Sequence, residues 1–142
     1  MTLAQYSKRL RMVDVNTVAS LTTPVLSPGQ AFKSQLTIAT YKAAQLLSVS
    51  SSAAARIEIY GTGVAQNADF SRGLDVPPGA GTAQNLVTDI ALDTAPFVWT
   101  YQNRVATNGN NPQTSVLYVT VTNIGNGARA ITVTLNYVPL ES

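Results

Sequence analysis

The chain has 142 residues, which is enough for one domain with a hydrophobic core and short for two. Charged residues make up 11% of it, against about 25% in an ordinary domain, and apolar residues make up 45%. Its surface is therefore either a polar, uncharged β-protein surface or one partly buried against other subunits, because interface cores are depleted in charge. The absence of His and Cys excludes disulfides, Cys/His zinc sites, thiol nucleophiles and His-dependent triads, and we expect no metal and no cofactor.

The small positive charge of the chain is local. The net charge is +2, and Lys8, Arg9 and Arg11 stand among the first 11 residues without an acid, whereas the rest has six basic and seven acidic residues. A nucleic-acid-binding domain is expected to carry a basic stripe, so nucleic acid is not a predicted partner. The start of the chain lacks the apolar region of a signal peptide, and no apolar run approaches about 18 residues, so no membrane association is predicted.

Residues 1–29 are predicted to form an extended N-terminal arm, with a short strand around residues 12–15. Breaks at Pro24, Pro28 and Gly29 favour extended structure over a helix. A disordered tail is the alternative. An arm that packs on its own domain or on a neighbour accounts better for the many apolar residues, which are Leu10, Met12, Val13, Val15, Val18, Leu21, Val25 and Leu26.

Three strands are expected next. Residues 30–40 and 41–50 each have strand character, although a helical turn competes at residues 43–47. Residues 55–62 alternate clearly between apolar and polar side chains, which is the period of a half-buried strand. The small residues 50–55 between the last two are predicted to form a hairpin connection.

The middle of the chain is dominated by a Gly- and Pro-rich loop over residues 61–86. Loops longer than about 12–15 residues are usually functional or disordered. Short strands are predicted at residues 86–92 and 97–101, followed by a polar loop over residues 102–114. Trp99, the only tryptophan, is interpreted as a core or cross-strand packing residue in preference to a ligand platform.

The C-terminal stretch, residues 115–140, has the strongest structural signal. It contains two runs of alternating apolar and polar residues, joined by a turn around Asn126 and Gly127 that suits a hairpin. With seven or eight short strands and no clear helix, the sequence predicts an all-β antiparallel β-sandwich or jelly roll over residues 30–142, preceded by the extended arm.

The acidic residues do not form a convincing catalytic or calcium-binding pattern. Asp69 and Asp75 share the long loop, and Asp89 and Asp93 flank a strand, where four residues span roughly 13 Å. Asp69 and Arg72 are interpreted as an ion pair within the loop, at the surface, whose loss should do little beyond loosening the loop.

Two further motifs are candidates for chemistry. The sequence GTGVAQ departs from the GxGxxG pattern at Gln66, and no helix is expected to follow it, so no phosphate site is predicted. The basic cluster KRLR either increases solubility or docks onto an acidic surface. No set of residues here supplies an enzyme mechanism, and the protein is not expected to be an enzyme.

A family resemblance rests on several short motifs. These are ARIEIYGT, then Asp69 and Arg72 about ten residues on, the Asp-x-Pro of residues 75–77, and the ending LYVTVTNIGNGARAITVTLNYV. Together they resemble a small β-sandwich module of tailed-bacteriophage virion proteins over residues 30–140. Such modules occur in head decoration, neck or tail-fibre components. The resemblance implies a structural or attachment role in a symmetric oligomer and brings no catalytic residues, and the N-terminal arm lies outside it.

The leading hypothesis is a capsid decoration (cement) protein at the surface of the phage particle, made in the host cytoplasm. The chain is short and has no coiled coil or repeat with which to build a fibre shaft. Its partners would be the major capsid protein or other virion subunits, and it would form a homo-oligomer, a dimer or a trimer. The arm would anchor it, and the candidate docking residues are Lys8, Arg9, Arg11, Met12, Val13 and Val15.

The alternative hypothesis is a receptor- or carbohydrate-binding module of a tail fibre or neck, with a host-surface glycan as its ligand. In this interpretation the loops at residues 61–86 and 102–114 form a sugar site together with Tyr60, Trp99 and Tyr101. Sandwich folds host many unrelated functions, so the fold alone does not decide between the two hypotheses.

Overall fold

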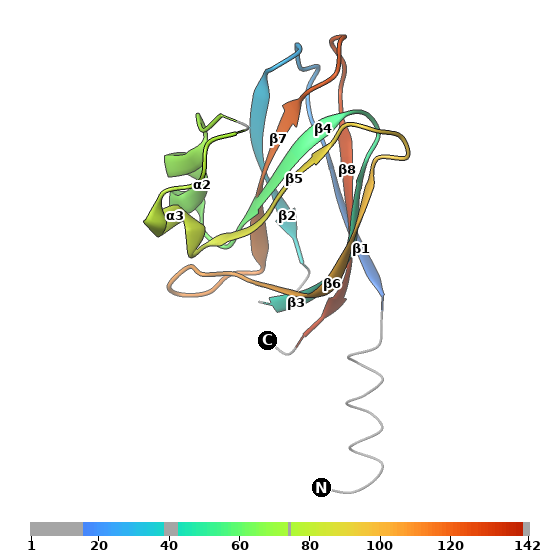
Figure 1. Cartoon of the computed structure of the whole chain (residues 1–142). Coiled ribbons are helices and arrows are strands. Elements are labelled where there is room, and N and C mark those ends of the chain that lie inside the picture. Colours follow the sequence, from blue (N-terminus) through green and yellow to red (C-terminus); the bar gives the residue numbers. More distant parts are fainter. Residues whose placement is uncertain (1–15, 39–42, 74, 141–142) are drawn as a thin grey trace, which may run out of the picture.

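The computed structural model describes residues 16–38, 43–73 and 75–140. In this part of the chain there are eight strands and two short helices (Figure 1). They are β1 (Thr17–Thr22), β2 (Ala31–Thr37), β3 (Ala43–Ser51), β4 (Ala55–Tyr60), α2 (Gly63–Asp69), α3 (Ala80–Ala83), β5 (Leu86–Leu92), β6 (Val98–Thr107), β7 (Val116–Asn123) and β8 (Thr132–Pro139).

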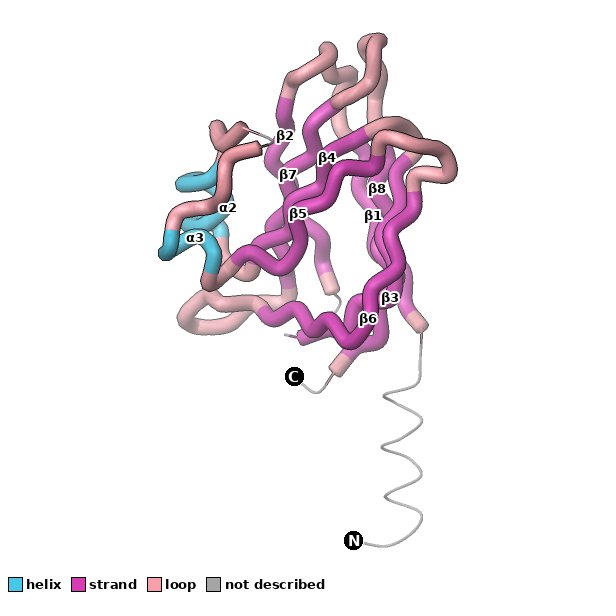
Figure 2. The backbone as a smooth tube through the Cα atoms, viewed as in Figure 1, coloured by secondary structure: helices cyan, strands magenta, loops and turns pink. Residues whose placement is uncertain are grey.

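The strands form two four-stranded antiparallel sheets that pack face to face. The first sheet has the order β1-β8-β3-β6, and the second has the order β2-β7-β4-β5. Figure 2 shows the helices on one side of the molecule, next to the second sheet, with the first sheet on the other side. The predicted all-β antiparallel sandwich is therefore confirmed.

The core lies between the sheets and follows from the alternation of side chains. Most apolar residues of the central strands point inward and are buried, as in β4, β7 and β8, where the inward series are Ile57 and Ile59, Leu117, Val119 and Val121, and Val133, Leu135 and Tyr137. Each buried aliphatic side chain contributes roughly 1.5–3 kcal/mol through its removal from water.

Both predicted hairpins are wrong. β7 belongs to the second sheet and β8 to the first, and likewise β3 and β4 lie in different sheets. Residues 124–131 therefore cross from one sheet to the other. The Asn123 side chain supports this crossing, because its amide donates to the backbone oxygens of Leu26 (2.8 Å) and Gly127 (2.9 Å) and its oxygen accepts from Gly125 N.

The predicted boundary between arm and domain is also wrong. β1 pairs with β8 along its whole length, from Thr17 opposite Tyr137 to Thr22 opposite Thr132. Leu26 is completely buried, and its backbone pairs with that of Arg129. The sandwich thus begins near residue 17, because the apolar residues of this stretch complete its own core. The six candidate docking residues and the strand expected at residues 12–15 lie outside the described residues.

The two helices correct the expectation that the chain has no clear helix. Both lie in the stretch that was predicted as a long loop. The helix α2 begins inside GTGVAQ, where the Thr62 hydroxyl accepts a hydrogen bond from Ala65 N (3.2 Å) and so caps the helix. The capping residue and the helix-favouring Ala65, Gln66 and Ala68 were the available signals.

The burial of Leu26 provides a direct test of the domain boundary. We expect Leu26→Ala to lower the free energy of unfolding by about 2–5 kcal/mol, because it leaves a cavity in the core. The neighbouring Val25 is 66% exposed, so Val25→Ala is the matched control and should change stability by less than about 0.5 kcal/mol. Urea denaturation of the two variants measures both values, and equal effects would contradict the assignment of Leu26 to the core.

Candidate functional site

The segment between β4 and β5 covers the outer face of the second sheet. Gln66 Nε2 on α2 donates to the backbone oxygen of Val119 in β7 (2.9 Å), and Lys33 Nζ in β2 donates to Asn67 Oδ1 (2.8 Å). These contacts tie the helix to two strands. As a result, side chains of β4 that point away from the core are nevertheless buried.

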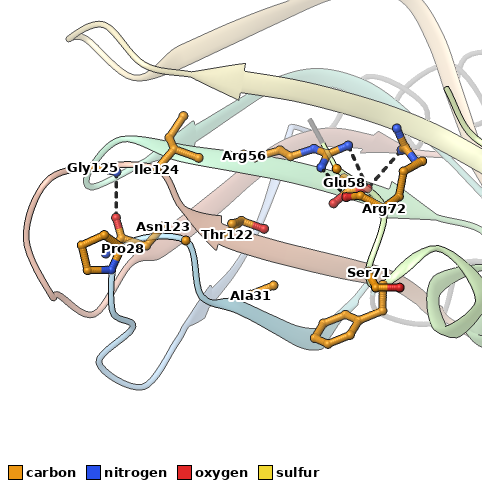
Figure 3. A pocket seen from close by; sticks show the side chains of 13 residues that line it. Pro28, Ala31, Arg56, Glu58, Ser71, Arg72, Thr122, Asn123, Ile124 and Gly125 are labelled. Atoms are coloured by element: carbon orange, nitrogen blue, oxygen red, sulfur yellow. Dashed lines mark hydrogen bonds and ion pairs between the residues drawn. The ribbon is translucent and has the colours of Figure 1, made fainter. Parts of the chain in front are cut away.

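A network of charged side chains lies beneath this cover (Figure 3). Arg56 binds Asp89 through two parallel hydrogen bonds of 3.0 Å. Arg72 Nε donates to Asp69 Oδ1 at 2.7 Å, and its Nη2 lies 3.1 Å from Glu58 Oε2 and 2.7 Å from Asp89 Oδ2. Arg72 therefore joins the long segment to β4 and β5 at once. We call Arg56, Glu58, Tyr60, Asp69, Arg72 and Asp89 the ionic network.

The register of the sheet explains why two arginines are needed. Glu58 in β4 stands directly opposite Asp89 in β5, and like charges in that position repel each other. Arg56 and Arg72 each contact both carboxyl groups. The second sheet thus accommodates a cross-strand acidic pair to which two guanidinium groups bind.

The hydroxyl group of Tyr60 indicates where a proton resides in the network. It lies 2.7 Å from Glu58 Oε2 and 2.5 Å from Asp69 Oδ2, but it has one proton to donate. One of the two carboxyl groups must therefore be protonated if both contacts are hydrogen bonds. Burial raises the pKa of Glu58 to about 7, whereas the pKa of Asp69 is below its usual value because hydrogen bonds from Arg72 and Tyr60 outweigh the effect of burial. Protonated Glu58 also leaves two positive and two negative charges in the network.

The surface ion pair predicted for Asp69 and Arg72 needs correction. The pair exists, but the Arg72 side chain is only 7% exposed and is shared with Glu58 and Asp89. The sequence does not show this, because Asp89 lies 17 residues from Arg72 and only the fold brings the two side chains together. Asp93, which flanks the same strand, is exposed and accepts a hydrogen bond from Thr94. Asp75 is also exposed. Arg56 and Glu58 were missed because the sequence shows them only as polar positions of an alternating strand, and Tyr60 was expected in a sugar site instead.

The network encloses one side of a pocket of about 550 Å³, between the turns at residues 28–31 and 122–125 and residues 70–73 (Figure 3). Its charged groups are already paired with one another, and the ring of Phe70 is covered by Lys33 Nζ, 4.7 Å from the ring centroid. In the described ranges, no group of three or more acidic side chains has an arrangement that could hold a metal ion. The network therefore fastens the long segment to the sheet, and it offers little to a ligand.

A second feature lies where the edge strands of the two sheets face each other. Trp99 and Arg104 stand opposite the buried residues Val49 and Leu46, so they point to the inner side of the first sheet. Because β6 is an edge strand, Trp99 remains 49% exposed, which contradicts the first part of its interpretation as a core or cross-strand packing residue and leaves the cross-strand position opposite Val49. Residues of β6 and β5 line a groove of about 520 Å³, which we call the edge groove; they are Val87, Thr88, Asp89, Ile90, Trp99, Thr100, Tyr101, Gln102 and Arg104.

Hydrogen bonds across the sandwich fix the walls of the edge groove. The Tyr101 hydroxyl accepts from Thr88 Oγ1 (2.8 Å), and Arg104 Nε donates to the backbone oxygen of Val87 (2.8 Å). Tyr60, which was expected to join Trp99 and Tyr101, is instead fully buried in the ionic network. The structure thus brings together two of the three aromatic residues proposed for a sugar site.

Known protein families and curated proteins give no indication of what this chain does. No family model matches the chain, and the search of curated proteins finds no match. Over the described ranges, none of the helices has the length and apolar character required to cross a membrane.

The ionic network predicts how stability depends on pH. The Glu58 carboxyl binds its proton more tightly in the folded protein, with a pKa of about 7 against an ordinary value of 4.5, so stability should fall as the pH rises between these values. The loss is about 3 kcal/mol at most. Asp69 and Asp89 have lowered pKa values, so their contribution is lost instead as the pH falls below about 4.

Urea denaturation at a series of pH values measures this profile. We expect a maximum near pH 5 and a decline towards pH 8. The chain contains no His, so few other groups titrate in that range. Glu58→Gln keeps a neutral side chain of similar shape and should remove the decline, and an unchanged decline in this variant would refute the assignment of the proton to Glu58.

Removal of Arg72 tests whether the ion pair is buried. Arg72→Ala leaves the carboxylates of Asp69 and Asp89 short of a partner, and we expect a loss of about 3–5 kcal/mol in the free energy of unfolding. Arg129→Ala, at an exposed arginine, is the control and should cost less than about 1 kcal/mol. A loss below about 1 kcal/mol for Arg72→Ala as well would restore the interpretation as a surface pair.

Proposed function

We propose that the protein is a structural protein of a tailed-bacteriophage virion, and within that class a capsid decoration protein anchored through its N-terminal segment. Its partners are the major capsid protein or other virion subunits, and it acts as a homo-oligomer on the particle surface. The sequence resemblance over residues 30–140 supports this class. The proposal assigns no catalytic step to any residue.

The observation that carries the proposal is the uncharged outer face of the first sheet. The four strands of that sheet contain one charged residue, Arg104, and its side chain points to the inner side, towards β5. The outer face consists largely of Ser, Thr, Asn, Gln and Val side chains, and some of them bind one another, as in Thr22 with Thr132 (2.9 Å) and Asn136 with Ser48 (3.1 Å). Such a face can be covered by another protein without the removal of any charge from water.

The size of this face explains why the N-terminal segment is needed. Four strands about 4.8 Å apart, with about seven residues at 3.3 Å each, cover on the order of 400 Å² before side-chain relief is counted. A stable interface buries about 800 Å² on each partner. Residues 1–15 lead directly into β1, an edge strand of the same sheet, so the segment with the candidate docking residues enters at the border of the uncharged face.

A truncation tests the anchoring role. Removal of residues 1–15 leaves β1 and Leu26 in place, whereas a longer deletion would remove part of the sandwich. We expect the full chain to sediment with heads assembled from the major capsid protein of the phage that carries its gene, and the truncated chain to stay in solution with unchanged circular dichroism. Equal binding of both chains would overturn the anchoring, and binding of neither would overturn the decoration role.

The role of the uncharged face is tested by a pair of charge insertions. Ser20→Glu places a carboxylate on this face, and Gln35→Glu places one at an exposed position of β2 in the second sheet. Because the first carboxylate would have to be dehydrated in the complex, we expect Ser20→Glu to reduce co-sedimentation by about tenfold or more and Gln35→Glu to leave it unchanged. Equal effects would contradict docking through this face.

A second candidate function is a receptor- or carbohydrate-binding module. One observation favours it, which is the exposure of Trp99 in the edge groove. This function is compatible with a place on the virion surface.

A further inference from the structure

We propose that the edge groove binds the ring of a neutral saccharide, with Trp99 as the stacking platform. This inference deepens the second candidate function and is independent of the decoration role. It differs from the site expected from sequence. Neither Tyr60 nor the segment at residues 61–85 lines the edge groove.

Trp99 is the first reason. It occupies an inward-facing position opposite the buried Val49, yet half of its surface remains accessible. A tryptophan offers 150–250 Å² for contact, so a large flat apolar surface lies open at the entrance of the groove. One face of a pyranose ring carries mainly C–H groups and can cover such a surface, while its hydroxyl groups point outward to polar partners.

The polar residues around Trp99 supply the second reason. Gln102 lines the groove, and the hydroxyl groups of Thr88 and Tyr101 meet at its wall, 2.8 Å apart. A planar amide can bind two neighbouring hydroxyl groups, and the Tyr101 hydroxyl, which accepts from Thr88, keeps its own proton to donate. A groove that combines one aromatic face with a few polar groups of this kind suits a small polar ring better than a purely apolar ligand.

The walls of the groove are already fixed. Tyr101 is bound to Thr88, and Arg104 is bound to the Val87 backbone. A binding site whose side chains do not have to be ordered loses less free energy when a ligand binds. This matters for a saccharide, which offers few apolar contacts.

The charges favour a neutral ligand. Arg104 contributes one positive charge, and the Asp89 carboxylate belongs to the ionic network on the outer face of the second sheet, where Arg56 and Arg72 compensate it. A phosphate or a nucleic acid strand would be expected to meet several basic side chains. A proline-rich peptide, which also docks on aromatic grooves, is the competing occupant and is treated as an outcome of the test.

The experiment uses Trp99 as its own reporter, because it is the only tryptophan in the chain. The full-length protein is titrated with neutral methyl glycosides of glucose, galactose, mannose and N-acetylglucosamine, and it is applied to an array of neutral glycans. We expect at least one of these saccharides to shift or quench the tryptophan emission in a saturable way, while light scattering shows no change in mass. No response from any of them would overturn the proposal, and so would a response only to a proline-rich peptide.

Variants then assign the binding to the groove. By isothermal titration calorimetry with the saccharide that responds, we expect Trp99→Ala to weaken binding by about tenfold or more and Trp99→Phe to retain most of it. Val105→Ala is the matched control, because Val105 lies on the same strand and is exposed, but it stands opposite Gln45 on the outer face. Unchanged affinity in Trp99→Ala, or an equal loss in Val105→Ala, would contradict the site.

The two proposals fail separately. Trp99→Ala should still sediment with phage heads as the parent chain does, since Trp99 lies on the inner side of the first sheet and away from its uncharged face. Loss of saccharide binding alone would therefore leave the decoration role intact. Conversely, saccharide binding without capsid binding would leave the edge groove as the function of the protein.

Discussion

The contact of Arg72 with three carboxyl groups is the interaction that holds the segment between β4 and β5 on the second sheet. It connects the end of α2 to β4 and β5, with side-chain distances between 2.7 and 3.1 Å to Asp69, Asp89 and Glu58. Buried ion pairs contribute little net stability, because the charges must first leave water. Their effect here is to define one position for a Gly- and Pro-rich segment that has few large apolar residues of its own.

The ionic network also accounts for the uneven distribution of charge. Five charged residues meet under one segment on the second sheet, whereas the first sheet has Arg104 alone. The two sheets therefore have different outer surfaces, although both share one core. One is covered by the chain itself through polar contacts, and the other is uncharged and, among the described residues, has no element packed over it. This asymmetry is what makes the first sheet the candidate for contact with another protein.

The sequence predicted the strands well and their partners poorly, for a physical reason. Alternation along β7 and β8 shows which side chains face the core, but both sheets of a sandwich face the same core, so the pattern does not tell which sheet a strand joins. The same ambiguity affected β3 and β4. The sequence predicted that the apolar stretch containing Leu26 packs on something, but not on what. The pairing of β1 with β8 joins distant parts of the chain, and a local pattern does not reveal such a pairing.

The candidate sites show the same limit. Arg56, Glu58 and Tyr60 look like the solvent side of a strand until the segment that covers them is placed. Trp99 looks like a core residue until its strand is known to be an edge strand. In both cases the residue types were visible, and the missing information was which element lies beside them.

The position of the last strand has a consequence for how the chain folds during synthesis. β8 lies between β1 and β3 and is the only neighbour of β1 within the first sheet. Within the described ranges, only β4 and β5 are consecutive strands that also pair, so nearly all strand pairing joins distant segments, which slows folding. The first sheet cannot close until residues 132–139 have left the ribosome, and a chain that stops earlier exposes the edges of both β1 and β3. The sandwich therefore reaches its native fold only after β8 has been made.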